Sequence, residues 1–132
     1  MAAKFPLEWG SKRQTAVSHS TPEAELVSLA HSFRTAGLPL QHLCETVLDC
    51  PVRINAHEDN EATIKVLAKG KSPALRHLVK THRISLAWVS AVSEEDGVTL
   101  RYCKTADQLA DGFTKALDRV KFQAAVIAIG MA

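Results

Sequence analysis

The sequence predicts an α/β domain with few strands. Two segments alternate apolar and polar residues as strands do, and several others repeat apolar residues at helical spacing. A chain of 132 residues can build one domain with a modest single core. We therefore expect residues 1–132 to form a single domain in which helices pack on a small mixed sheet.

The composition, net charge and cysteine spacing are typical of an ordinary globular protein. Hydrophobic residues make up 46% and charged residues 23%, which is ordinary for a globular protein, and the net charge of +2 argues against a strongly basic arm. The three cysteines have no C-x-x-C spacing, which predicts reduced thiols and an intracellular setting, cytoplasmic or nuclear. Because no apolar stretch approaches the ~20 residues of a membrane span, no membrane partner is expected.

The N-terminal third predicts a short strand followed by two helices. Alternating apolar residues over 5–9 predict the strand and place Trp9 in the core. Thr21 is a suitable N-cap for the first helix, with Ser20 and Glu23 as an alternative capping box. Glycine at Gly37 predicts the end of this helix, and Pro39 suits the first turn of the next.

The rest of the chain alternates strands with helices. The expected strands cover residues 50–57 and 98–103. Between them, Asp59 and Asn60 end the first strand and can cap a helix that closes at Gly70, and a second helix covers about 84–92. Thr105 with Gln108 resembles a capping box and predicts another helix through residue 117. A last helix begins at about Asp118.

Three acids fall at junctions between these elements: Glu25, Asp59 and Asp111. Carboxylates that converge at such junctions can hold Mg²⁺, which prefers hard oxygen ligands. The alternative for each is a solvated or capping role, as for most of the 14 acidic residues.

Four ordered blocks between Lys12 and Leu117 resemble one family. They read K-R-Q-x-x-V-S-x-S-T-P-E-A-E (12–25), H-E-D-N-E-A (57–62), R-H-x-x-x-T-H (76–82) and Y-x-x-T-x-x-Q-L-A-D-G-F-T-K-A-L (102–117). This pattern is similar to the ribonuclease H domain of Ty1/copia-type retrotransposon Pol polyproteins, which also contain a reverse transcriptase. The resemblance implies a ribonuclease H-like fold.

The resemblance also implies a site and a reaction. Enzymes of this family cleave the RNA strand of an RNA–DNA hybrid with two Mg²⁺ ions held by four acids. By position, Glu25, Asp59 and Asp111 match three of these acids. Glu23 matches less well, because the family's helix ligand directly precedes the residue matched here by Leu26.

The chain departs from the family at its start. The family's first catalytic Asp lies on a central strand before the first block, but only eleven residues precede Lys12 and their one acid is Glu8. We therefore expect a partial, N-terminally truncated domain without the first two strands, and weak or no nuclease activity. Upstream sequence or a partner chain would have to supply those strands. The alternative function is a non-catalytic remnant or a domesticated nucleic-acid-binding or interaction module.

Basic residues suggest where a nucleic acid would bind. Six Lys or Arg and no acid occur from Lys65 to Arg83, which predicts either a phosphate-contacting face or an ordinary solvated face. The two histidines in this run could act on phosphate or could be exposed or capping residues. The expected partners are an RNA–DNA hybrid or another nucleic acid, and the upstream reverse transcriptase portion. The candidate contact residues are Lys12, Arg13, Arg76, His77, Lys80 and His82.

Overall fold

The computed structural model describes residues 4–131. The chain forms two compact units. The first, called the central unit, contains residues 14–103. The second, called the terminal unit, combines residues 1–13 with residues 104–132. Each unit is described separately below.

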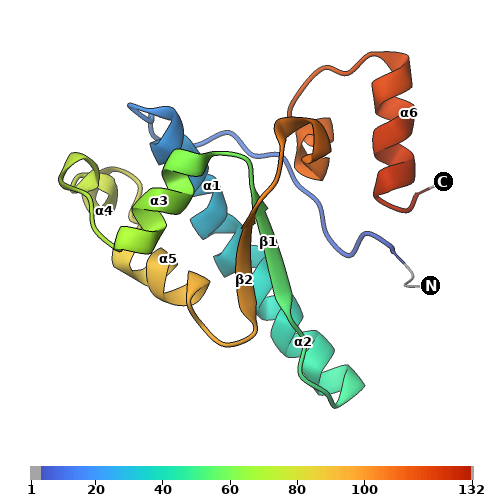
Figure 1. Cartoon of the computed structure of the whole chain (residues 1–132), viewed down its shortest axis with the longest axis horizontal. Helices are drawn as coiled ribbons and strands as arrows, with labels where there is room; N and C mark the ends of the chain where they lie inside the picture. Colours follow the sequence, from blue (N-terminus) through green and yellow to red (C-terminus); the bar gives the residue numbers. More distant parts are fainter. Residues whose placement is uncertain (1–3, 132) are drawn as a thin grey trace. The chain divides into compact units, whose positions relative to one another are not determined.

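The central unit contains a two-stranded parallel sheet. Strand β1 (Ile54–Glu58) pairs with β2 (Val98–Tyr102), with Ile54 opposite Val98 and Glu58 opposite Tyr102. The crossover between them contains three α-helices, so the two strands belong to a βαβ unit. The path of the chain from β1 to β2 can be followed in Figure 1. The expected α/β class is confirmed, with both central strands near their predicted positions. The expectation of a mixed sheet is wrong for the described residues, because the two strands run parallel.

One long helical run precedes the sheet. It consists of α1 (Thr21–Ser32), the π-helical turn η1 (Phe33–Gly37) and α2 (Leu38–Leu48), which follow one another directly in Figure 1. The predicted helix end at Gly37 is therefore wrong. Gly37 has helical angles of φ −57 and ψ −60, and the wider π turn passes through it, with the Leu38 N–H donating to the Phe33 carbonyl. Pro39 lies in the first turn of α2, where a missing N–H costs little.

The core lies between α1 and the crossover helices. Leu26, Ala30 and Phe33 form the buried stripe of the α1–η1 run. They belong to one apolar cluster with Leu67 of α3 and Val89 of α5. Helix α2 contributes no buried residue, and its apolar residues Leu43, Val47 and Leu48 are exposed.

The crossover helices begin at polar caps. Helix α3 (Glu61–Lys69) starts at Asn60, whose Oδ1 accepts the Thr63 N–H at 3.1 Å, and it stops at Gly70 with φ +67. A 3₁₀ turn η2 (Pro73–Leu75) and the short α4 (Leu78–Thr81) lead to α5 (Leu86–Ser93). Of the two residues predicted to cap α3, Asp59 and Asn60, Asn60 is the N-cap, and the predicted stop at Gly70 is confirmed.

The terminal unit differs most from the sequence-based expectation. Residues 5–9 form no strand, and Trp9 is 60% exposed, because no neighbouring strand pairs with this segment among the described residues. The helix expected from Thr105 is replaced by two 3₁₀ turns, η3 (Thr105–Asp107) and η4 (Leu109–Phe113). Neither turn has a side-chain capping bond at its N-cap, which is Lys104 for η3 and Gln108 for η4. The last helix, α6 (Arg119–Ala128), begins after Asp118 as expected.

Among the described residues, no helix is both long and apolar enough to cross a membrane.

Candidate functional site

Three carboxylates converge at the end of β1. Glu25 comes from the second turn of α1, Glu58 is the last residue of β1, and Asp59 follows it. Each offers one carboxylate oxygen such that the three oxygens lie within 4.8 Å of one another. This acidic cluster therefore brings together two of the three acids that the sequence proposed, Glu25 and Asp59.

Local sequence explains why these side chains meet. Strand β1 alternates between the two faces of the sheet, so Ile54, Ala56 and Glu58 share the inward face. Asn60 then leaves the strand to cap α3, which places Asp59 at the junction between strand and helix. Helix α1 packs against α3, and its first turns therefore bring Glu25 to this end of the strand.

Glu58 is the residue of this cluster with the most altered electrostatics. Its residue surface is 4% exposed, and burial raises its pKa from 4.5 to about 7. The Asn60 N–H, which donates to Oε1 at 3.0 Å, opposes this rise, while the charges of Glu25 and Asp59 add to it. Three neighbouring carboxylates resist full ionisation without a cation, so the cluster is chemically suited to bind one.

A second carboxylate, Glu23, has a different set of partners. Its Oε1 lies 3.0 Å from His77 Nε2 and 3.1 Å from His82 Nε2, and its Oε2 accepts the His19 N–H at 3.0 Å. Burial alone would raise the pKa of Glu23, but these hydrogen bonds and the His77 charge hold it below its ordinary value. The ionised carboxylate thus joins the start of α1 to the segment around α4.

Both histidines contact the Glu23 carboxylate, and the His82 side chain is 2% exposed while that of His77 is 33% exposed. His77 and His82 are the N-cap and C-cap residues of α4, as the capping alternative expected, but the His77 side chain makes no capping hydrogen bond. Glu23 does begin the helix as expected, since its N–H donates to the Ser20 hydroxyl at 3.3 Å. Ser20, the alternative cap, is the N-cap of α1, and Thr21 is not.

Asp111, the third predicted metal ligand, belongs to the terminal unit. It lies in the 3₁₀ turn η4 rather than in the expected α-helix. Its Oδ2 accepts a hydrogen bond from Lys115 Nζ at 2.6 Å. The geometry of the acidic cluster is therefore described for Glu25, Glu58 and Asp59 alone.

The remaining candidate residues are surface cations. Lys12 and Arg13 lie in the terminal unit and are exposed, as are Arg76 and Lys80 in the central unit. These four side chains are accessible to a polyanion, in contrast to His82.

The burial of Glu23 and Glu58 was not predicted from the sequence, although the sequence contains a pattern that indicates it for both residues. Glu58 continues the inward alternation of Ile54 and Ala56 by one more step. Glu23 lies three residues before Leu26, on the core-facing stripe of α1. An acid on an apolar stripe indicates a buried carboxylate that must have a partner or a raised pKa.

The donor set of the acidic cluster fits a hard divalent cation. All three candidate ligands are carboxylates, and Mg²⁺ is commonly held by one or two such groups with water completing its shell. Sulfur and imidazole ligands, which favour softer metals, are absent from this cluster of described residues.

Comparison with known proteins shows that the sequence is similar to transposon polyproteins. The chain is 27% identical over 122 residues to the retrovirus-related Pol polyprotein from transposon RE2 of Arabidopsis thaliana, covering 89% of this chain. It is also 27% identical over 130 residues to that from transposon RE1 of the same plant, covering 96% of this chain. The match spans 8% of the length of each polyprotein. No family model and no solved structure matches the chain.

These similarities confirm the coarser part of the sequence-based prediction. The chain is similar, over most of its length, to a segment of two retrovirus-related Pol polyproteins from transposons. Its assignment to the ribonuclease H portion stays a prediction.

Proposed function

We propose that this chain is the ribonuclease H-like part of a copia-type retrotransposon Pol polyprotein, and that Glu25, Glu58 and Asp59 bind Mg²⁺. The observation that carries the proposal is the convergence of these three carboxylates within 4.8 Å at the end of β1. Two of them occupy the positions at which the sequence motifs expect metal ligands. Glu58 is an additional ligand that the motifs do not assign.

The cation would supply the hydrolytic chemistry. When bound, Mg²⁺ would help to activate a water and to stabilise the leaving oxygen in phosphodiester hydrolysis. Glu25 on α1, and Glu58 and Asp59 at the end of β1, are the residues that would hold the cation. Asp111 is the further ligand that the motifs propose, and its Oδ2 accepts a hydrogen bond from Lys115.

The proposed substrate is an RNA–DNA hybrid. The exposed side chains of Lys12, Arg13, Arg76 and Lys80 would contact backbone phosphates, which position a nucleic acid without reading its sequence. The 2′-hydroxyl groups would distinguish the RNA strand from DNA. The reverse transcriptase part of a longer polyprotein is the proposed protein partner.

A second candidate is a binding module without nuclease activity. It is favoured by the hydrogen bond from Lys115 to Asp111, which engages one oxygen of the third carboxylate that the motifs assign. It requires the same phosphate contacts but no cleavage.

Titration with Mg²⁺ and incubation with a labelled RNA–DNA hybrid test both candidates. We expect Mg²⁺ binding to weaken by about tenfold or more in Glu25→Gln, Glu58→Gln and Asp59→Asn, because each removes one anionic ligand. Glu61→Gln is the matched control, since Glu61 is an exposed acid at the start of α3.

The outcomes separate the candidates. Hybrid cleavage that Asp59→Asn abolishes supports the nuclease, whereas hybrid binding without cleavage supports the binding module. Mg²⁺ binding that is equal in all four variants contradicts the metal site.

A further inference from the structure

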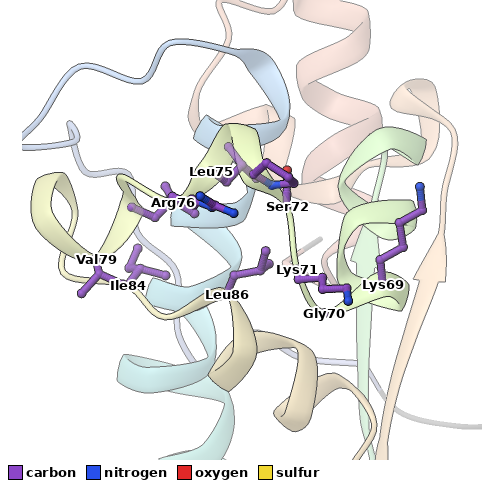
Figure 2. A pocket seen from close by; sticks show the side chains of 11 residues that line it. Lys69, Gly70, Lys71, Ser72, Leu75, Arg76, Val79, Ile84 and Leu86 are labelled. Carbon is purple, nitrogen blue, oxygen red and sulfur yellow. The ribbon is translucent and has the colours of Figure 1, made fainter.

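We propose that a hollow on the central unit docks an acidic peptide segment carrying a large apolar side chain. This surface is separate from the acidic cluster. It is formed by the end of α3, the loop through η2, helix α4 and the start of α5. Figure 2 shows the labelled side chains arranged around it.

The hollow has a volume of about 710 Å³ and an apolar floor. Leu75, Leu78 and Ile84 line it and belong to the buried core, so the floor is held by packing and does not need to form on binding. Val79 also lines the hollow and is 61% exposed. An apolar side chain of a partner could therefore bury surface here that now faces water.

The rim of the hollow is basic. Lys69, Lys71 and Arg76 line it, and none of the described residues that line it is acidic. The sequence contains no acid between Glu61 and Glu94, so no carboxylate from this stretch neutralises the rim. A partner with negative charges around an apolar centre would match both features.

An acidic peptide fits this combination better than a nucleic acid does. A phosphate backbone could pair with Lys71 and Arg76, but it would lay charged groups over Val79 and Leu86. A peptide can place one apolar side chain on the floor and its carboxylates at the rim. Central apolar anchors of this kind carry most of the binding energy in protein interfaces.

The test uses the full chain and a fluorescein-labelled peptide in which one leucine and one phenylalanine are flanked by aspartates and glutamates. Fluorescence anisotropy measures the dissociation constant. We expect Lys71→Gln and Arg76→Gln each to weaken binding by about three- to tenfold, because each removes a rim charge. Val79→Asp should weaken it by more than about tenfold, because it adds a negative charge where the apolar side chain docks.

Two controls make the test specific. Lys65→Gln removes an exposed cation from the same acid-free stretch outside the hollow, and it should change binding by less than about twofold. A peptide with serine in place of leucine and phenylalanine should bind at least about tenfold more weakly. Circular dichroism verifies that the variants are folded.

Three results would overturn the proposal. The first is the absence of peptide binding, and the second is equal weakening by Lys65→Gln and Arg76→Gln. The third is equal binding of the serine peptide together with competition by a single-stranded oligothymidylate, which would identify a general polyanion surface.

Discussion

Two buried glutamates in the central unit show how environment decides the behaviour of one side-chain type. Glu23 is ionised because two histidines and a backbone N–H bond its carboxylate. Glu58 is buried beside two other acids, and its pKa rises to about 7. The first carboxylate stabilises the fold in its charged form, whereas the second opposes folding when it ionises.

We expect substitution of each glutamate by neutral glutamine to change the free energy of unfolding in opposite directions. Without metal, Glu58 lowers the free energy of unfolding as pH rises from about 4.5 to about 7, because the folded state retains its proton longer than the unfolded state. Glu58→Gln should therefore raise the free energy of unfolding by about 1–2 kcal/mol at about pH 8. Glu23→Gln should lower it by about 2 kcal/mol, because two imidazoles and the His19 N–H lose a charged acceptor.

Urea denaturation in chelator at about pH 5 and about pH 8 measures both effects. The Glu58→Gln gain should shrink at the lower pH, where Glu58 is protonated in the parent. The Glu23 contribution is present above its ordinary pKa of 4.5 and is lost only as pH falls through its lower folded value. Equal and same-sign changes in the two variants would show that these environments are misassigned.

At the scale of elements, Gly37 and Gly70 differ in backbone conformation, although the sequence predicted that both would end helices. Gly70 does so with φ +67, and an added Cβ would lie 3.3 Å from the Ser90 hydroxyl. Gly37 has φ −57 inside the continuous run from α1 to α2, where an added Cβ would meet only ordinary contacts, the nearest at 3.5 Å. The conformational freedom of glycine is used at Gly70 and not at Gly37.

Alanine substitution should therefore separate the two glycines. Gly37→Ala should raise the free energy of unfolding by about 0.5–1 kcal/mol, because it reduces the entropy of the unfolded chain at a helical position. Gly70→Ala should lower it by about 1 kcal/mol or more, because the left-handed angle strains a side chain and Ser90 is fixed by its bond to the Leu67 carbonyl. Thermal and urea denaturation measure both variants. Destabilisation by Gly37→Ala would indicate that the π turn itself requires glycine.

At the scale of the whole molecule, the apolar core belongs to the central unit. Within residues 4–131, the eleven buried hydrophobic residues all lie between Leu26 and Val98. No described residue of the terminal unit is buried, and several of its large apolar side chains, Trp9 and Phe122 among them, are exposed. The interactions that hold a cooperative fold are thus concentrated in residues 14–103.

We expect a fragment of residues 14–103 to unfold cooperatively and to bind Mg²⁺ as the full chain does, because it contains the core and all three carboxylates of the acidic cluster. Heat denaturation followed by circular dichroism and titration with Mg²⁺ measure these properties. A peptide of residues 104–132 serves as the control and should show little helix, since isolated helices of this length are marginal in water. A non-cooperative transition of the 14–103 fragment would show that the terminal unit contributes to the core.

The sequence by itself determined the features that depend on neighbouring residues. Asn60 and Asp118 begin helices because their side chains bond N–H groups three residues ahead, and the alternation in residues 50–57 and 98–103 marks the two strands. Motif positions also singled out Glu25 and Asp59. The relation to a transposon polyprotein followed from such blocks without any knowledge of the fold.

Only the tertiary structure decided which distant side chains meet. His82 and Glu23 are 59 positions apart in the sequence, and Glu58 joins Glu25 because α1 packs against α3, the helix that follows β1. The expected strand at residues 5–9 failed for the same reason, since a strand needs a partner that its own sequence does not contain. Local hydrogen bonds and periodicity depend on residues within one short segment, whereas the burial of a carboxylate and the pairing of a strand depend on residues far along the chain.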